Sequence, residues 1–349
     1  MDGRFYVKGQ AMKKAVILGE RQAALVDVPE PKAKEDWAVV KVHATPMCTE
    51  YKGFVGGHKS EFLGHEAIGE VVEVAQPCKV KVGDRVVVQP QYPCGKCRLC
   101  IAGDYIHCQD CYDFAAFTGS REGSATYAQY VLKPSWLLSP IPNGVSYERA
   151  GLAICGLGPS LGAFEAMGVS AFDTVLVTGL GPVGLGGVVN ARFRGARVIG
   201  VDSVPYRVER AKAMGAAAVL SPADKDLVKK LRELSGGRGA DCALDCSGTV
   251  AAQRTCVEAT RRKGKVAFVG ECGDELAIRV SPDLIRTGIA ILGSWHYNLN
   301  YFPKIMKVIQ ESPLIGLLIS HVMPMSRIQE AFELSASHET AKVVLKPWE

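Results

Sequence analysis

The pattern of hydrophobic and polar positions changes near residue 146. Before it, short β-branched runs alternate with glycine, proline and charged residues, as in chains that fold into many short strands. The predicted strands cover residues 15–18, 38–42, 70–74, 85–88 and 125–132. This half is therefore predicted to form an all-β barrel or sandwich.

After residue 146, strand-like apolar runs alternate with helix-like segments. Strands are predicted at residues 174–178, 197–201, 217–220, 241–245, 265–269 and 290–293, and helices in segments that contain residues 205–214, 226–234 and 251–262. This alternation is typical of a parallel sheet covered by helices. A last helix at 327–335 and a strand at 341–345 can belong to either half.

One uncharged run, residues 174–191, reaches the length of a membrane span. It contains five glycines, Pro182 and Asn190, and charged segments flank it. Because glycine and proline interrupt regular structure, we interpret the run as a buried strand followed by a helix.

The chain is long enough for two cores, since 349 residues exceed the usual size of one domain. Hydrophobic residues make up 48% and charged residues 22%, which are the proportions of an ordinary globular protein. The formal net charge of +5 is spread without a long basic run. A nucleic-acid partner is therefore not expected.

Twelve cysteines would suggest disulfides in a small secreted protein. This chain is large, and its first residues contain no apolar segment of signal-peptide length. We therefore expect a cytoplasmic protein in a reducing compartment. Residues 1–11 precede a second methionine, Met12, and are expected to be an extension of the fold.

Four cysteines stand within fifteen residues in the spacing C-x2-C-x2-C-x7-C, at Cys94, Cys97, Cys100 and Cys108. Four thiolates this close can surround one tetrahedral zinc ion. A site closed by four sulfurs has no open coordination position. It is predicted to hold a loop together, so any chemistry must lie elsewhere.

A glycine motif follows the predicted strand at 174–178 and precedes a segment of small, helix-like residues: Gly179, Leu180, Gly181, Pro182, Val183 and Gly184. In this context, G-x-G-x-x-G is the signature of a dinucleotide site. The glycines permit a tight turn, a close approach of the backbone to pyrophosphate and close packing of the helix on the strand. The pyrophosphate would lie at the helix N-terminus, where free N–H groups favour negative charge.

Asp202 ends the next predicted strand, eighteen residues after the last glycine of the motif. Its carboxylate would accept hydrogen bonds from the adenosine ribose and repel a 2′-phosphate, which favours NAD over NADP. Arg207 follows five residues later and could contact the ribose or accommodate a phosphate. NADP therefore stays the alternative.

The order of these features resembles that of the zinc-containing medium-chain alcohol dehydrogenases. The matching stretch runs from about residue 13 to residue 345 and includes Cys48, G-H-E-A-I-G-E-V from Gly64, G-D-R-V from Gly83, the four cysteines, Cys155 ahead of G-L-G-P-V-G, and a closing A-K-V-V-L. The resemblance implies a two-domain α/β protein. A GroES-like β-barrel catalytic domain would comprise residues 1–156, completed by 296–349, and a Rossmann NAD-binding domain would comprise 157–295.

The resemblance also implies a second, catalytic zinc held by Cys48, His65 and Cys155, with a fourth position open to water or substrate. Glu66 is expected either to serve as a neighbouring or exchanging ligand, or to hold its loop by hydrogen bonds. In such a site zinc lowers the pKa of an alcohol, whose carbon passes hydride to the nicotinamide.

The chain departs from the family pattern just after Cys48. Many relatives have a hydroxyl residue that starts a proton relay and then an aspartate, one residue later than Thr49 and Glu50 stand here. Either Glu50 replaces the relay hydroxyl, or one residue is missing and Thr49 and Glu50 take the hydroxyl and acid roles. We favour the second interpretation because it restores both chemical types in order. Lys52 and His58 are candidates for the end of the proton route, although a solvated surface role is expected for each.

By the same resemblance, five residues lie near the nicotinamide or the mouth of the pocket: Val269, Gly270, Ile291, Leu292 and Trp295. Trp295 can equally serve packing or subunit contacts. The segment 290–294 matches the strand through which relatives join their nucleotide domains. A homodimer or homotetramer is therefore expected.

The leading hypothesis is a zinc- and NAD-dependent dehydrogenase of a primary or secondary alcohol, with polyols and sugar-like alcohols included. Reduction of an aldehyde or ketone with NADPH is the second hypothesis. A catalytically silent nucleotide-binding protein is the third, and the presence of Cys48, His65 and Cys155 disfavours it. No membrane partner is expected.

Overall fold

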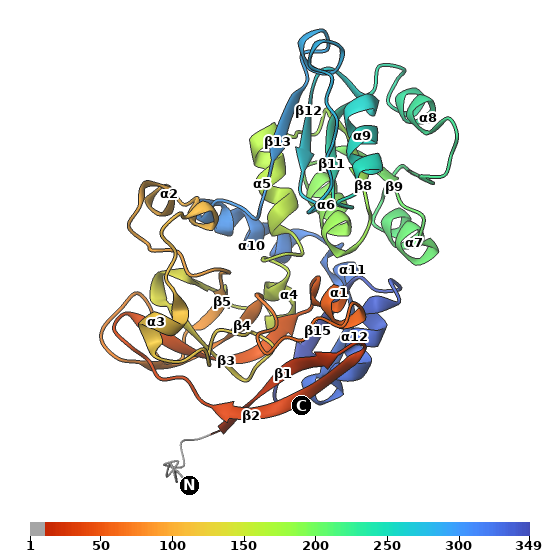
Figure 1. Cartoon of the computed structure of the whole chain (residues 1–349). Coiled ribbons are helices and arrows are strands. Elements are labelled where there is room, and N and C mark those ends of the chain that lie inside the picture. Colours follow the sequence, from red (N-terminus) through yellow and green to blue (C-terminus); the bar gives the residue numbers. More distant parts are fainter. Residues whose placement is uncertain (1–10) are drawn as a thin grey trace. The chain divides into compact units, whose positions relative to one another are not determined.

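The computed structural model describes residues 11–349 (Figure 1). Of the expected extension at 1–11, only Ala11 is included, where it begins the first strand, and the rest lies outside the described residues. The chain forms two compact units. The first comprises Met1–Gly151, His321–Ser337 and Val343–Glu349, and the second comprises Leu152–Ser320 and His338–Lys342. The predicted domains divide the chain at other residues, and those boundaries stay a prediction.

The first unit is built around antiparallel strands. Two of them form a hairpin sheet, and the larger sheet has the order β14-β15-β3-β4-β5-β7, with β6 paired to β3. The strands are β1 (Ala11–Gly19), β2 (Gln22–Pro29), β3 (Trp37–Pro46), β4 (Ala67–Val74), β5 (Arg85–Val88), β6 (Tyr130–Pro134), β7 (Leu138–Pro140), β14 (Ile319–Pro324) and β15 (Lys342–Lys346). The helices are α1 (Glu50–Val55), α2 (Arg98–Ile101), α3 (Phe114–Thr118), α4 (Tyr147–Gly151) and α12 (Ile328–Ala336), with 3-10 turns at Tyr105–His107, Ser135–Leu137 and Met325–Arg327.

Alternation along β3 gives this unit two packed faces. Ala38, Val40 and Val42 point into one buried cluster with residues of β4 and β5. Trp37 and Val39 point to the opposite side, where aromatic rings cover them. Successive side chains of a strand point to opposite faces, so a run that is apolar at every position indicates a strand buried on both sides.

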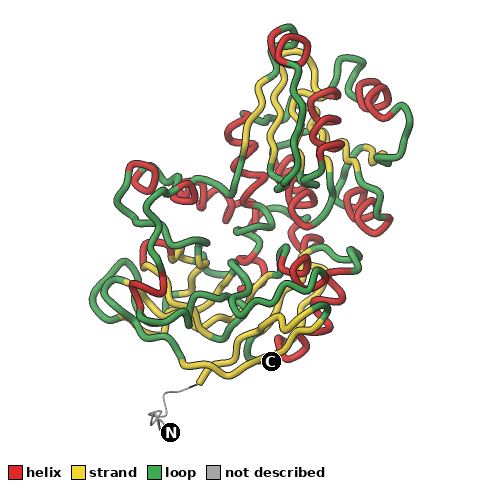
Figure 2. The backbone as a smooth tube through the Cα atoms, in the orientation of Figure 1, coloured by secondary structure: helices red, strands yellow, loops and turns green. Residues whose placement is uncertain are grey.

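The second unit contains a six-stranded sheet with helices on both faces (Figure 2). All its pairings are parallel, in the order β10-β9-β8-β11-β12-β13, as the sequence predicted. The strands are β8 (Thr174–Thr178), β9 (Arg197–Val201), β10 (Ala218–Leu220), β11 (Ala240–Asp245), β12 (Thr260–Phe268) and β13 (Ala290–Gly293). The helices are α5 (Gly158–Met167), α6 (Pro182–Phe193), α7 (Pro205–Ala213), α8 (Leu227–Leu234), α9 (Val250–Ala259), α10 (Phe302–Glu311) and α11 (Ile315–Leu318). The strand order reverses at β8 and β11, and ligands of such sheets bind beyond the carboxyl ends of the strands at that point.

Three sequence predictions need correction. The strand expected at 125–132 begins only at Tyr130, because Thr126 and Tyr127 donate their N–H groups to Leu63 O rather than to a neighbouring strand. The helix expected to run to residue 262 ends at Ala259, since Thr260 is already extended and begins β12. The segment 48–65, for which the sequence predicted no helix or strand, contains α1.

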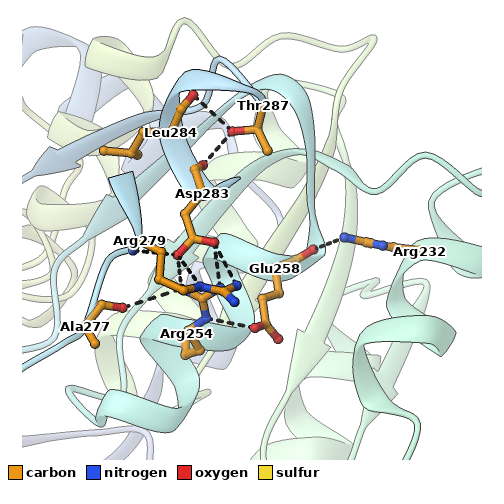
Figure 3. A network of polar contacts seen from close by, with 8 residues as sticks. All are labelled: Arg232, Arg254, Glu258, Ala277, Arg279, Asp283, Leu284 and Thr287. Atoms are coloured by element: carbon orange, nitrogen blue, oxygen red, sulfur yellow. Dashed lines mark hydrogen bonds and ion pairs between the residues drawn. The ribbon is translucent and has the colours of Figure 1, made fainter. Parts of the chain in front are cut away.

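A buried carboxylate fastens the turn before β13 (Figure 3). Asp283 lies in a π-helical turn, Val280–Ile285, and is 5% exposed. Arg254 of α9 binds it through two nitrogens at 2.6 and 3.0 Å, and Arg279 donates to it at 3.1 Å. These hydrogen bonds hold the pKa of Asp283 well below its ordinary value, so the carboxylate stays ionised. Its ion pair with Arg254 therefore connects the turn to α9.

Among residues 11–349, no single helix has the length and apolar character needed to cross a membrane. One pair bent by 51°, Tyr147–Gly156 with Gly158–Met167, meets the criterion by length and composition alone.

Candidate functional site

The four clustered cysteines lie between β5 and β6, on and around the short helix α2. The Sγ atoms of Cys97 and Cys100 are 3.5 Å apart, and those of Cys94 and Cys108 are 3.6 Å apart. The Cys94–Cys100 and Cys97–Cys108 pairs are each separated by 3.9 Å. Four sulfurs bound to one zinc at about 2.3 Å lie roughly 3.8 Å from one another. A disulfide would need about 2.05 Å, and no disulfide joins any of the twelve cysteines, all within 11–349. The four thiols therefore fit a closed tetrahedral metal site.

The backbone around these cysteines also suits thiolates. The N–H groups of Cys97 and Cys94 donate to the Sγ atoms of Cys94 and Cys108, both at 3.4 Å. Gly95 has a φ of +73°, and a Cβ there would lie 2.9 Å from Nε1 of Trp136. The turn between the first two cysteines thus requires glycine.

A second group of possible metal ligands comprises Cys48, His65, Glu66 and Cys155. Their ligand atoms all lie within 4.8 Å of one another. Cys48 follows β3, whereas His65 and Glu66 directly precede β4, and these two strands pair antiparallel. Two thiols, an imidazole and a carboxylate are donors that zinc accepts, so the residues fit a zinc ion.

Glu50 holds the imidazole of this group. Its Oε1 lies 2.9 Å from Nδ1 of His65, which leaves Nε2 as the nitrogen available to a metal. Burial opposes the charged imidazole, but hydrogen bonds to Cys48 and Glu50 outweigh it and raise the pKa of His65 to about 11. Burial also opposes the charged form of Glu50 and on its own would raise the pKa of this carboxyl. The hydrogen bond and charge of His65 outweigh burial and lower the pKa of Glu50 to about 2. A carboxylate that accepts from the remaining N–H of a ligating histidine is a common support of metal sites.

The other residues considered for proton transfer lie at the surface. Thr49 is exposed and precedes the first turn of α1. Lys52 and His58 are also exposed.

Sequence reasoning missed Tyr127. Its hydroxyl donates to Oε2 of Glu50 at 2.8 Å and accepts the N–H of Cys48 at 3.2 Å. This N–H also lies 3.1 Å from the same Oε2. The only sequence signal was an aromatic residue inside a predicted strand, which does not indicate contact with residues 48–65.

The glycine motif forms the turn between β8 and α6. Gly179 has a φ of +77°, and a Cβ on Gly184 would lie 1.8 Å from the carbonyl oxygen of Gly179. Pro182 and Val183 begin α6, directly after Gly181. The N-terminus of α6 can therefore approach an anionic group closely.

Asp202 and Arg207 flank this turn. Asp202 is buried after β9 and accepts the N–H groups of Leu180 at 2.6 Å and Val204 at 2.8 Å. The guanidinium of Arg207 lies 3.8 Å from a Cβ placed on Gly181, and its Nη2 lies 3.1 Å from Nδ1 of His338. Sequence reasoning did not single out His338.

The residues predicted near the nicotinamide lie within or directly after two neighbouring strands, β12 and β13. Val269 comes directly after β12 and donates its N–H to Asp245 at 2.9 Å. Leu292 lies in β13 and pairs with Ala267 of β12. A Cβ on Gly270 would lie 2.2 Å from the backbone nitrogen of Gly248, so this turn admits only glycine.

Two family models match the chain. One is the alcohol dehydrogenase GroES-like domain, over residues 34–143, and the other is the zinc-binding dehydrogenase, over residues 182–311. Together they span the segments that carry the four cysteines, Cys48, His65 and the second half of the glycine turn, from Pro182.

Individual proteins are similar over most of the chain. YphC of Escherichia coli (strain K12), an uncharacterized zinc-type alcohol dehydrogenase-like protein, is 35% identical over 307 residues, which cover 86% of this chain and 83% of that protein. Sorbitol dehydrogenase of Bacillus subtilis (strain 168) is 30% identical over 353 residues, with coverages of 97% and 98%. The solved structure of alcohol dehydrogenase TADH from Thermus sp. ATN1 has a TM-score of 0.87 and 24% identity, and covers 96% of this chain and 99% of that one. That likeness shows a shared fold.

Proposed function

Because this chain belongs to the zinc-containing medium-chain alcohol dehydrogenase family, we propose that it is an oxidoreductase that transfers hydride between an alcohol and a nicotinamide cofactor. The observation that carries the proposal is the group of Cys48, His65, Glu66 and Cys155, whose ligand atoms lie within 4.8 Å. A catalytic zinc site needs three protein ligands and one open position. Cys48, His65 and Cys155 supply the three, and Glu66 either exchanges with them or holds its loop.

When bound, zinc would supply the Lewis acidity that lets an alcohol lose its proton near neutral pH, and the nicotinamide would supply the acceptor for hydride. The chain's own residues provide the arrangement. Glu50 holds Nδ1 of His65 and so fixes the orientation of the ring. Glu50 thus acts as the acid of the shortened segment, and Thr49 is proposed as the exposed hydroxyl from which the proton leaves.

The same chain would bind a second zinc through the four clustered cysteines. Sulfur separations of 3.5 to 3.9 Å support this assignment. All four positions would be sulfur, so this ion would stabilise the segment between β5 and β6 and take no part in hydride transfer.

NAD is the proposed cofactor. The turn at Gly179–Gly184 and the N-terminus of α6 would receive the pyrophosphate. The buried carboxylate of Asp202 supports NAD, because it would repel a 2′-phosphate. Arg207 favours the alternative, NADP, since its guanidinium lies beside the same turn.

Polyols and sugar-like alcohols are the proposed substrates, with simple primary and secondary alcohols as further candidates. The relative named sorbitol dehydrogenase supports this choice. We further propose a homodimer or homotetramer that uses β13, the strand at one edge of the six-stranded sheet. Reduction of aldehydes or ketones with NADPH is the second candidate function, favoured only by Arg207.

The decisive experiment combines metal analysis with a panel of alcohols, polyols and sugar alcohols, assayed by absorbance of the reduced cofactor with NAD and with NADP. We expect two zinc ions per chain and activity with NAD. One zinc per chain and no turnover with any alcohol or carbonyl would overturn the proposal.

A further inference from the structure

We propose that Tyr127 is a positioning residue of the second metal site: its hydroxyl fixes the carboxylate of Glu50, which in turn orients His65. The inference rests on the proposed function, because it concerns the same site. Its hydroxyl also accepts the backbone N–H of Cys48, but the side chain would act on the imidazole through Glu50.

The two carboxylate oxygens of Glu50 have different partners. Oε1 faces Nδ1 of His65 at 2.9 Å, whereas Oε2 accepts the Tyr127 hydroxyl at 2.8 Å and the N–H of Cys48 at 3.1 Å. A carboxylate bound at both oxygens cannot rotate without breaking a hydrogen bond. The direction in which Oε1 presents itself to the imidazole is therefore set by Oε2.

The phenol is held as firmly as the carboxylate. Tyr127 is fully buried, and its backbone N–H and carbonyl bond to Leu63 and Ala15 at 3.0 and 2.8 Å. Its ring also packs against Gly64, where a Cβ would lie 2.4 Å from Cδ1 of the ring. Gly64 is the residue before His65, so one side chain packs against the backbone of the ligand segment and also binds the carboxylate that holds the ligand.

The short connection between Cys48 and Glu50 explains why the Tyr127 hydroxyl is needed to hold the Glu50 carboxylate in place. With only Thr49 between them, the carboxylate folds back onto the N–H of Cys48 and reaches His65 from the start of α1. A glutamate has one more rotatable bond than an aspartate and loses more freedom when it is held. The hydroxyl of Tyr127 reduces that freedom before a metal binds.

The test compares Tyr127→Phe with a matched control, Tyr92→Phe. Tyr92 also donates its hydroxyl within the first unit, to the carbonyl of Ser124 at 3.2 Å, but it does not contact the site. Zinc release to the chelator dipicolinate is followed for wild type and both variants, together with KM and kcat. Partners that support metal ligands are worth about 10- to 100-fold in affinity or activity. We expect Tyr127→Phe to release one of its two zinc ions about tenfold faster or more, and Tyr92→Phe to match wild type.

A double-mutant cycle separates positioning from general loosening of the fold. In a Glu50→Gln background, Tyr127→Phe should accelerate zinc release much less than it does alone, because its route to His65 is already broken. If Tyr127→Phe does not fold, Glu50→Asp tests the same link, since the shorter side chain cannot hold both His65 and Tyr127.

Three results would decide against the inference. Equal zinc release from wild type and Tyr127→Phe would overturn it and leave the proposed function standing. Full acceleration by Tyr127→Phe in the Glu50→Gln background would show that Tyr127 does not act through Glu50. A wild-type chain that releases only the zinc of the four cysteines would overturn the proposed function as well.

Discussion

Oε1 of Glu50 lies 2.9 Å from Nδ1 of His65, and this contact joins the start of α1 to the segment before β4. The hydrogen bond fixes which imidazole nitrogen is left for a metal. In the proposed site it would give Glu50 the role that the family pattern leads us to expect of an aspartate one residue later.

Glu50→Gln keeps the size of the side chain and removes its charge. We expect kcat to fall about 10- to 100-fold, because the amide holds the imidazole less firmly and no longer supplies the negative charge that supports a ligating histidine. Steady-state kinetics with the best substrate of the panel measure this. Glu61→Gln, at an exposed position of the same unit, serves as the control. Unchanged kcat in Glu50→Gln would show that the carboxylate does not support the site.

Cys155→Ala should remove one zinc ion per chain and nearly all hydride transfer. The loss should exceed about 1,000-fold, since a site that polarises the reacting oxygen cannot work with two ligands. Zinc analysis and turnover are measured on the same sample, with circular dichroism to show that the fold persists. Full turnover in this variant would exclude the proposed mechanism.

Cys97→Ser should lower thermal stability and leave hydride transfer almost unchanged, in contrast to Cys155→Ala. A weakened closed site destabilises the segment between β5 and β6, so we expect the thermal midpoint to fall by several degrees, equivalent to about 2–4 kcal/mol. The kcat measured well below that midpoint should change little. A variant with one zinc fewer and an unaltered thermal midpoint would contradict a structural role.

Asp202→Ser should shift the cofactor preference toward NADP. The change removes the negative charge beside the turn and leaves the guanidinium of Arg207, so the ratio of kcat/KM for NADP over NAD should rise about tenfold or more. The variant also loses the bonds to Leu180 and Val204, which should lower kcat/KM with NAD. Adding Arg207→Ala to this variant should reverse the gain with NADP. A ratio that stays constant would remove Asp202 as the determinant.

Lys133→Met should stabilise the chain most at low pH. Burial lowers the pKa of Lys133 to about 7, from the ordinary 10.5. Between these values the unfolded chain holds a proton that the folded chain releases, so the free energy of unfolding of wild type rises with pH. At pH 6 the variant should gain about 1–3 kcal/mol, less than burial alone implies because the ammonium lies 3.9 Å from the centre of the Tyr92 ring.

Urea denaturation at pH 6 and pH 9 checks this expectation, with Lys59→Met as the control for an exposed lysine. The difference between Lys133→Met and wild type should shrink from pH 6 to pH 9. An equal difference at both pH values would mean that Lys133 does not titrate in this range.

The central strands of the parallel sheet were predictable because they are buried on both faces. Residues 174–178 and 197–201 are strands with the predicted bounds, since runs rich in β-branched residues have few other buried conformations. Residues 290–293 also form a strand with the predicted bounds, although this edge strand is partly exposed. The hairpin strand β2 was missed, because its side chains are mostly half-exposed and carry no clear alternation. Helix α9 was extended too far, since local pattern does not show that the strand begins at Thr260, where this residue pairs with Ala240 of β11.

The sequence suggested the ligands but not their support. Cys48, His65 and Cys155 stood out through the family pattern, and the structure gathers them with Glu66. The role of Glu50 stayed open because spacing alone cannot tell which way a side chain turns at the start of a short helix. The contact of Tyr127 with Glu50 could not be predicted from the sequence, for a simpler reason. This contact depends on how the segment before β6 crosses the residues before β4, and local pattern does not encode that crossing.

The position of β15 has a consequence for how the first unit folds. Most of the second unit lies between β3 and β15 in the sequence, yet Thr45 and Pro46 at the end of β3 pair with Leu345 and Val344 of β15. The rest of β3 pairs with β4 and β6, which lie much nearer in the sequence. Contacts between distant segments form late, because their loop-closure entropy is lost before they contribute stability. The end of β3, just before Cys48, is therefore expected to be among the last parts of the larger sheet to form.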